Sequence, residues 1–377
     1  MLRQDYPMAW GLAQVANSIF AGLSVTGTSD EMGLGESPSG RECFLLVDGL
    51  GLDAVEKYAA EFPIFSQFSL HRDLLSHFPT TTATNISSFG TGLFPGAHGM
   101  LGYTVRVPNS GEPGRLLNAL KWDERVDPVI WQNRPTLFER ASREGITVTH
   151  IAAKRYEGSG FTQAVLRGAR YVGANRIEEM VANAIDALAQ PNSFVYLYIN
   201  NVDAAGHETG VGSPKWLAAL ATTAELLTSL TSRLPRGTRL WVSADHGMIN
   251  VGEGEDQKIV LGRGNNLLDG VTMIGGEPRA RHLYLREGSV DDTKAMWEET
   301  LGDGVLLFTK IDAPTLFGES IRDESYDRMG DLIAVPRNNR ILVDPERVRQ
   351  ESSMVGHHGG MNEEELAIPL LSTVIGG

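Results

Sequence analysis

The chain has 377 residues, of which 42% are hydrophobic, so it can form a large buried core and is neither a disordered nor a collagen-like polypeptide. Its 33 Lys and Arg against 47 Asp and Glu give a formal net charge of −14, which repels nucleic acid and anionic lipid, and we predict neither as a partner. The single cysteine, Cys43, excludes an internal disulfide, whereas nine histidines beside this acidic excess leave room for a metal-dependent enzyme.

The first predicted element is a helix near the N-terminus. Residues 8–25 carry no charge and could be read as the apolar part of a secretory signal peptide. Their apolar residues, however, recur three and four apart: Leu12, Val15, Ala16, Ile19, Phe20 and Leu23. We therefore predict an amphipathic helix that packs on the domain. No other stretch approaches the roughly 20 apolar residues of a bilayer span, so we predict a cytoplasmic protein without a membrane partner.

Short apolar runs then alternate with helix-like segments. The predicted strands are residues 43–47, 145–153, 194–199 and 239–243, and the predicted helices are residues 53–68, 136–143, 176–189 and 215–234. Alternation of this kind indicates an α/β fold with a mostly parallel sheet and helices on both faces. Such a fold collects ligands at the carboxyl ends of its strands.

The pattern changes between residues 252 and 347, which we predict to be a smaller inserted α+β subdomain. Its expected strands are residues 282–285, 305–311 and 331–335, and its expected helix is 291–301. The apolar tail 366–374 is predicted to return to the main sheet as its last strand. We therefore predict a single catalytic domain over residues 1–377, with the insertion inside it.

Ionisable side chains follow four of the predicted strands, where a ligand would bind. They are Asp48, the pair Lys154 and Arg155, Asp203, and the pair Asp245 and His246. Any one of them could be a helix cap or a solvated charge. Because four strands deliver such groups to one edge, we predict a functional site there.

Asp and neutral His are ligands that suit Zn²⁺, with Mn²⁺ as a substitute where carboxylates dominate. Asp203 and His207 are four residues apart, and His357 and His358 precede two glycines near the end of the chain. Six ligands are about right for two catalytic ions with open positions: Asp48, Asp203, His207, Asp245, His246 and one of His357 and His358.

A threonine-rich segment could supply a hydroxyl nucleophile to such a centre. Residues 78–85 contain four threonines and precede a helix-like stretch, 86–91. A hydroxyl at a helix start lies near free N–H groups that attract phosphate oxygens. From this segment alone, simple capping of the helix by Thr84 or Asn85 is the better interpretation.

Residues 49–54 match the glycine-rich dinucleotide fingerprint. However, Asp48 directly before Gly49 would place a carboxylate against the pyrophosphate. A nicotinamide site would also leave the Asp and His set unexplained, so we prefer the metal site.

Six ordered segments together resemble the motifs of the alkaline phosphatase superfamily, and most nearly those of its type I nucleotide pyrophosphatases/phosphodiesterases. These segments span most of the chain: residues 47–49, 79–85, 91–99, 203–207, 243–248 and 358–360. The resemblance implies an alkaline phosphatase-like fold. It also implies a hydrolase that acts on small phosphoester or nucleotide substrates. Retention of the whole set argues against a degenerate metal-binding or interaction protein.

The resemblance also assigns roles. Thr82 would be the nucleophile, and Asn85 would donate to a phosphoryl oxygen. The ion that binds Thr82 would be held by Asp48, Asp245 and His246, and the second ion by Asp203, His207 and His358. The segment departs from the family at Ala83-Thr84, where nucleotide-cleaving members commonly carry Phe-Pro, which leaves the specificity open.

We therefore predict a two-metal phosphoester hydrolase that cleaves nucleotide phosphodiester or pyrophosphate bonds through a phosphothreonine on Thr82. The alternatives are a phosphomonoesterase that uses Lys154 and Arg155 for the extra charge of its substrate, and a phosphonate hydrolase of the same superfamily. Aromatic residues that could stack on a nucleobase are Tyr103, Trp122 and Trp131. The sequence makes no prediction of the oligomeric state.

Overall fold

A computed structural model describes residues 10–71, 74–111 and 114–377. Its centre is a seven-stranded sheet in the order β2-β17-β8-β1-β7-β5-β6. The five parallel strands are β1 (Arg41–Val47), β5 (Thr147–Ala152), β6 (Arg170–Gly173), β7 (Ser193–Ile199) and β8 (Arg239–Ser243). The predicted last strand is β17 (Leu370–Val374), which lies antiparallel between β8 and β2 (Ser69–His71).

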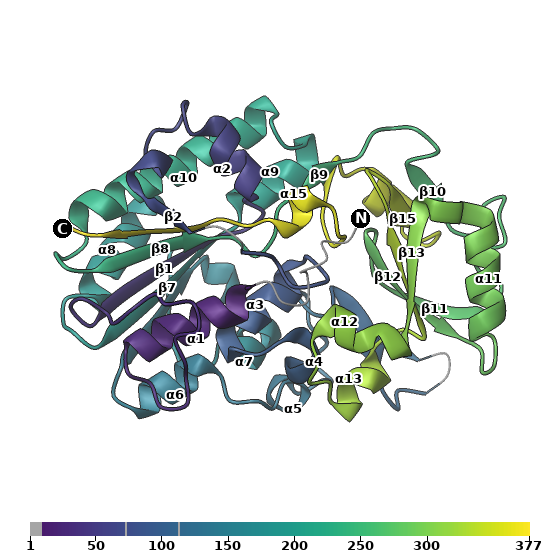
Figure 1. The fold of residues 1–377 in the computed structure, drawn as a ribbon, viewed down its shortest axis with the longest axis horizontal. Helices are drawn as coiled ribbons and strands as arrows, with labels where there is room; N and C mark the ends of the chain where they lie inside the picture. Colours follow the sequence, from purple (N-terminus) through teal and green to yellow (C-terminus); the bar gives the residue numbers. More distant parts are fainter. Residues whose placement is uncertain (1–9, 72–73, 112–113) are drawn as a thin grey trace.

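Helices cover both faces of this sheet (Figure 1). One layer contains α1 (Leu12–Gly22), α3 (Thr82–Thr91), α6 (Leu137–Arg143) and α7 (Gly160–Val165). The other contains α2 (Leu52–Tyr58), α8 (Ile177–Ala187), α9 (Asn201–Thr209) and α10 (Pro214–Arg233). Because both faces are covered, β1 and β8 are buried along almost their whole length, which explains their continuous apolar sequence. The predicted α/β fold is confirmed.

Two predictions for single helices had different outcomes. The predicted N-terminal helix is α1, and its apolar side is fully buried; Met8 lies outside the described residues. The predicted helix 53–68 is wrong over its second half, because α2 ends at Tyr58 and only a short 3₁₀ turn, Phe65–Gln67, follows. Pro63 lies between them, and the residue before a proline is disfavoured in a helix.

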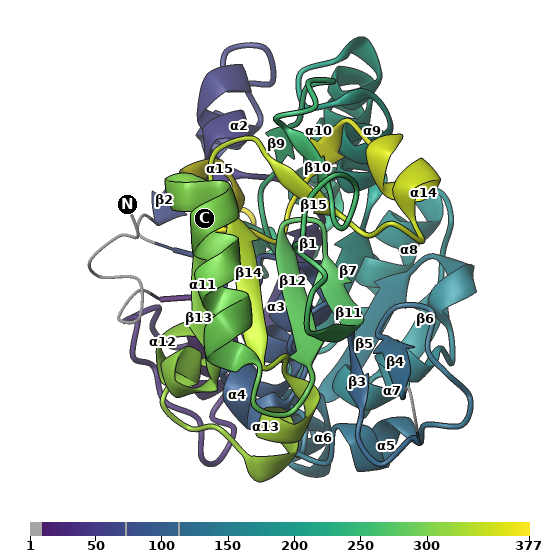
Figure 2. The same ribbon diagram turned by 90° about the vertical axis from the view of Figure 1, so that its right-hand side faces the viewer.

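A second, antiparallel sheet lies beside the first (Figures 1 and 2). Its order is β11-β12-β14-β13, and its strands are β11 (Val271–Glu277), β12 (Ala280–Leu285), β13 (Val305–Thr309) and β14 (Leu332–Pro336). Helix α11 (Val290–Leu301) covers it, and Trp297 belongs to a separate apolar core there. Strand β11 was not predicted. The boundaries 252–347 of an inserted subdomain stay a prediction.

Shorter elements connect these layers. The strand pairs are β3 (Thr104–Val107) with β4 (Arg115–Asn118), β9 (Ile249–Asn250) with β16 (Gly356–His357), and β10 (Lys258–Val260) with β15 (Ile341–Val343). The short helices are α4 (Pro95–His98), α5 (Pro128–Trp131), α12 (Ala313–Phe317), α13 (Asp323–Arg328), α14 (Val348–Ser352) and α15 (Glu363–Leu366). None of the helices in the described ranges is long and apolar enough to cross a membrane.

Candidate active site

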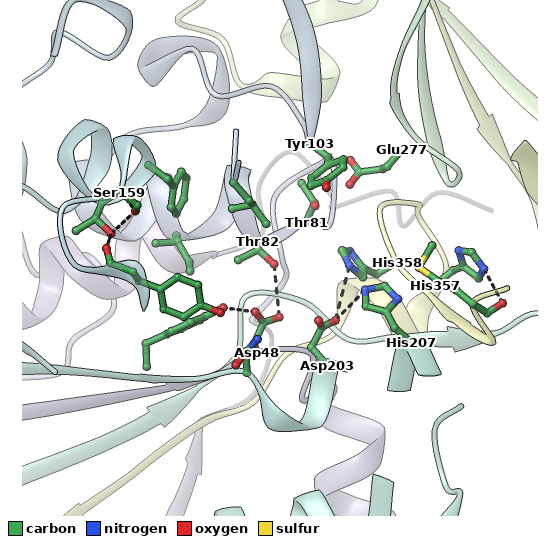
Figure 3. A pocket seen from close by; sticks show the side chains of 18 of the residues that line it. Asp48, Thr81, Thr82, Tyr103, Ser159, Asp203, His207, Glu277, His357 and His358 are labelled. Carbon is green, nitrogen blue, oxygen red and sulfur yellow. Dashed lines mark hydrogen bonds and ion pairs between the residues drawn. The ribbon is translucent and has the colours of Figure 1, made fainter. Parts of the chain in front are cut away.

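A cavity of ≈ 350 Å³ lies at the carboxyl ends of β1 and β7. Its walls come from both sheets, because it is lined by Asp48 after β1, Asp203 in α9, Thr82 in α3 and Glu277 at the end of β11 (Figure 3). The main sheet thus supplies one side of the cavity and the second sheet part of the other. The predicted edge of the main sheet is where the cavity lies.

Asp48 and Asp203 meet through a close approach of two backbones. The Asp203 N–H donates to the Asp48 carbonyl at 3.1 Å, and the Gly49 N–H donates to an Asp245 carboxylate oxygen at 3.2 Å. Gly49 has a φ of +75°, and a Cβ there would lie 3.0 Å from the Asp203 Cα. This glycine therefore serves to bring carboxylates together, and its N–H faces a carboxylate of the protein.

Asp203 and His207 face each other because they are one turn apart on α9. This helix was not predicted, but its i,i+4 spacing places both side chains on one side. His207 Nε2 lies 3.3 Å from Asp203 Oδ1, and His358 Nε2 lies 3.8 Å from the same oxygen (Figure 3). His357 is directed elsewhere, with its Nε2 3.3 Å from the Met354 carbonyl. The choice of His358 over His357 agrees with this geometry.

Asp48, Asp245 and His246 form a second group beside the first. His246 Nε2 lies 3.4 Å from Asp48 Oδ1 and 3.5 Å from Asp245 Oδ2, and the His246 ring stacks on the His358 ring with centroids 3.7 Å apart. Ligand atoms of this group lie within 4.8 Å of one another, as do those of Asp203, His246 and His358. The six predicted ligands therefore converge, and His246 belongs to both groups.

The backbone sets the orientation of all three imidazoles. His207 Nδ1 donates to the Gly356 carbonyl at 2.8 Å, His246 Nδ1 to that of Gly247 at 3.0 Å, and His358 Nδ1 to that of Thr80 at 2.9 Å. A carbonyl only accepts, so Nδ1 carries the hydrogen and a neutral ring presents the Nε2 lone pair to the carboxylates. This tautomer is the one suited to binding a metal through Nε2.

The carboxylates are arranged for a cation that compensates them. Asp203 Oδ1 and Asp245 Oδ2 are buried and accept no hydrogen bond from the described residues. Burial, together with the negative charges of Asp245 and Asp203, raises the pKa of Asp48 well above its usual range. Burial also lowers the pKa of His358 well below its usual range, which keeps this ring neutral. Buried carboxylates facing imidazole lone pairs fit divalent metal ions.

Thr82 is the first residue of α3 and lies beside the second group. Its Oγ1 is 3.5 Å from Asp48 Oδ1 (Figure 3). It is also 3.2 Å from His246 Nε2. The helix begins earlier than predicted, and its N-cap is Thr81, so the interpretation of Thr84 or Asn85 as the cap is wrong. The hydroxyl of Thr82 therefore lies next to the free N–H groups of the first turn.

Asn85 has a different environment from the one its predicted role requires. Its amide nitrogen donates to the carbonyls of His77, Pro79 and Thr81 at 3.0–3.2 Å, and its Oδ1 accepts from the His77 N–H at 2.7 Å. The side chain is fully buried and does not line the cavity. These bonds argue against donation to a phosphoryl oxygen. Asn85 instead fixes the loop that positions Thr82.

Lys154 and Arg155 follow β5 as predicted, but neither lines the cavity. The Arg155 guanidinium donates to the Tyr156 hydroxyl at 2.7 Å and to Asn200 Oδ1 at 3.1 Å. Of the three aromatic candidates, only Tyr103 lines the cavity. Trp122 donates to the Val126 carbonyl at 2.8 Å and Trp131 stacks beneath the guanidinium of Arg328, so both have structural roles.

A family model described as type I phosphodiesterase / nucleotide pyrophosphatase matches residues 43–361. The chain belongs to this family. The predicted resemblance is confirmed, and the protein is a hydrolase of phosphodiester or pyrophosphate bonds. The two clusters of Asp and His could hold the metal that this chemistry needs. No curated protein sequence matches the chain.

Solved structures of the type I phosphodiesterase family share this fold. Murine ectonucleotide pyrophosphatase/phosphodiesterase 5 matches with a TM-score of 0.67 at 17% identity, over 88% of this chain and 87% of that one. Its inactive threonine-to-alanine variant, in complex with AMP, matches equally well. The human protein matches over the same shares, with a TM-score of 0.64 and 18% identity.

Two polar residues of the cavity were missed in the sequence. The Tyr198 hydroxyl donates a short hydrogen bond to Asp48 Oδ2, and Glu277 is a buried carboxyl whose pKa burial raises to about 7. Tyr198 lies within a predicted strand, one residue from its end, and this position at the ligand-binding edge could have identified it. Glu277 ends an unpredicted strand of the second sheet, so the sequence offered no comparable signal.

Proposed function

We propose that the protein cleaves phosphodiester or pyrophosphate bonds of nucleotide substrates with Thr82 as the nucleophile and two divalent ions, Zn²⁺ or Mn²⁺. The observation that carries the proposal is the position of Thr82 Oγ1, 3.2 Å from His246 Nε2, at the start of α3. Asp48, Asp245 and His246 would hold the ion beside Thr82. The other ion would be held by Asp203, His207 and His358.

The bound ions would supply Lewis-acid stabilisation and lower the pKa of the attacking hydroxyl. Thr82 Oγ1 attacks phosphorus in line and its proton passes to solvent, while the P–O bond to the leaving group breaks and a leaving alkoxide takes up a proton from water. A water molecule then attacks the phosphothreonine from the side that the leaving group vacated, which releases the product and restores Thr82. The N–H groups at the start of α3 stabilise the phosphoryl oxygens during both steps.

The lining of the cavity favours a diester over a monoester. A monoester dianion benefits from a Lys or Arg near its additional charge. Among the described lining residues the only such side chain is Arg347, and neither Lys154 nor Arg155 is present. The AMP complex of the murine relative supports a nucleotide as the substrate. Among the residues that the structure describes, we find none that specifically favours the phosphonate hydrolase.

The test compares kcat/KM for 4-nitrophenyl thymidine 5′-phosphate and 4-nitrophenyl phosphate with protein loaded with Zn²⁺ or Mn²⁺. We expect the diester to be the better substrate. A strong preference for the monoester would reverse the proposal in favour of a phosphomonoesterase. If neither compound is hydrolysed with either metal, hydrolysis of a dinucleoside pyrophosphate is measured next, because the proposal includes pyrophosphate bonds.

A further inference from the structure

The cavity continues from Thr82 into a pocket between the sheet and two helices. We call it the inner lobe and define it by six lining residues: Ile86, His150, Phe161, Leu166, Tyr196 and Tyr198. They come from α3, from α7 and the residue after it, and from β5 and β7. None is charged at neutral pH, because burial lowers the pKa of His150 to about 3 and raises that of Tyr196. The inner lobe therefore differs from the acidic metal clusters at its mouth.

Two polar side chains lie side by side at the sheet side of the inner lobe. His150 and Tyr196 are paired in register on neighbouring strands, and their rings meet edge to face with centroids 5.2 Å apart. His150 is 3% exposed and Tyr196 is 0% exposed. Within the described chain, neither His150 Nδ1 nor the Tyr196 hydroxyl has a hydrogen-bond partner.

Unpaired buried polar atoms at this place call for a physical reason. Phe at either position would fill similar space without an unmet hydrogen bond, and leaving a buried donor or acceptor unpaired costs folding free energy. Of the remaining lining, Ile86, Phe161 and Leu166 are apolar and buried, and the Tyr198 hydroxyl is already bonded to Asp48. A ligand whose far edge carries hydrogen-bonding atoms would satisfy the polar pair and fill the apolar space between it and Thr82.

The size of this ligand group follows from the strand geometry. Tyr196 and Tyr198 lie on the same side of β7, and the Tyr198 hydroxyl contacts Asp48 at the mouth. Two residues along a strand span about 7 Å. His150 and Tyr196 therefore lie about the length of one ring farther from the mouth than Tyr198 does. A charged far edge is disfavoured, since no lining residue of the inner lobe would neutralise it.

We propose that the inner lobe binds one ester group of the substrate, a flat and uncharged ring whose far edge is recognised by His150 and Tyr196. This inference rests on the proposed function, because it requires phosphorus to be held at Thr82. Neutral imidazole and a phenol each offer one donor and one acceptor, so an edge that carries a hydroxyl, amide or imide fits both. The two residues would thus determine specificity.

The test uses two ligands that differ only at the far edge, 4-hydroxyphenyl phosphate and 4-methylphenyl phosphate. Calorimetry measures their affinity for Thr82→Ala protein loaded with Zn²⁺, in which no turnover occurs. Turnover is measured separately with their methyl diesters, whose methyl group is too small to fill the inner lobe. We expect the hydroxyl compound to be favoured at least about tenfold in Kd and in kcat/KM.

His150→Phe and Tyr196→Phe should each remove most of this preference, so that the ratio of the two compounds in Kd and in kcat/KM falls towards one. Tyr171→Phe is the matched control: the Tyr171 ring lies against His150, but its hydroxyl donates to the Ala153 carbonyl and the residue does not line the cavity. Thermal unfolding shows that each variant is folded.

The proposal would be overturned if protein with His150 and Tyr196 intact bound the two ligands with equal affinity. It would also be overturned if Tyr171→Phe lost the preference to the same extent as the two pocket variants. A preference for a 4-(trimethylammonio)phenyl phosphate would overturn it as well, because that result would indicate an aromatic site for a cation. Failure of the proposed function has a different signature, since the diesters would then resist hydrolysis while the difference in Kd remained measurable.

Discussion

The mouth and the inner lobe of the cavity meet at β7, but their buried polar groups have opposite character: charged at the mouth and neutral in the inner lobe. At the mouth, three carboxylates and three imidazoles lie close together beside Thr82, and burial together with the charges of Asp245 and Asp203 raises the pKa of Asp48. In the inner lobe, the neutral pair His150 and Tyr196 lies among apolar side chains. The difference supports the two proposals made above, in which the mouth performs the chemistry and the inner lobe selects the substrate.

The largest effect should come from removing the nucleophile at the mouth. Thr82→Ala should lower kcat/KM for a phosphodiester by about a thousandfold or more, because no other group could form the phosphothreonine. Bound metal, measured by elemental analysis, should remain. Thr91→Val, at the other end of α3, should retain normal turnover. Unchanged rates in Thr82→Ala would exclude Thr82 as the nucleophile.

Removing a ligand should lower both metal content and rate. Asp203→Asn weakens the group to which His207 and His358 belong, so bound metal should fall from about two equivalents to about one, and kcat/KM by about a hundredfold. The control is Asp186→Asn on α8, an exposed position away from the cavity. Full metal content in Asp203→Asn would contradict the two-ion model.

Tyr198 connects the two regions, so its effect should be intermediate. Its hydroxyl donates to Asp48 Oδ2, and loss of such a bond to a ligand typically costs about 10- to 100-fold in metal affinity or activity. Tyr198→Phe should therefore require more Zn²⁺ for half-maximal activity, as a metal titration would show. A shift of the same size in Tyr171→Phe would mean that the effect is not specific to Asp48.

The smallest effect concerns stability and pH in the inner lobe. Burial lowers the pKa of His150 from 6.5 to about 3, so between these values the unfolded chain binds more protons than the folded one. Stability therefore falls as the pH drops below 6.5. His150→Phe should reduce the loss of unfolding free energy between pH 7 and pH 5 by about 2 kcal/mol, measured by urea titration. Equal losses in both proteins would mean that His150 binds a proton as readily in the folded protein as in the unfolded chain.

The sequence predicted the main sheet well where strands are buried on both faces. Residues 43–47 form an unbroken apolar run because β1 lies in the middle of the sheet, whereas β6 and β11 are partly exposed and carry no such signal. Asp48, Asp203 and Asp245 were predicted because each follows an apolar strand, and they lie together because β1, β7 and β8 are adjacent. The cytoplasmic location stays a prediction.

Strand order and hydrogen bonding explain what the sequence did not reveal. Lys154 follows β5, which lies two strands from β1 and therefore about 10 Å away, and strand order is not readable from apolar runs. Asn85 has the residue type of a phosphate donor, but its amide is occupied by the backbone carbonyls of His77 and Pro79, which depends on the path of the preceding loop and not on residue type. The polar pair His150 and Tyr196 became visible only once the register of β5 and β7 was known.

The hydrogen bonds from His207, His246 and His358 to backbone carbonyls have a consequence for how the family can diversify. Because main-chain atoms hold these rings, the side chains that surround them are free to change without tilting an imidazole. Residues such as Ala83, or those that line the inner lobe, can then be substituted without moving the imidazoles. A change of substrate could therefore come from substitutions in one wall of the cavity, while the three imidazoles and their backbone hydrogen bonds stay the same.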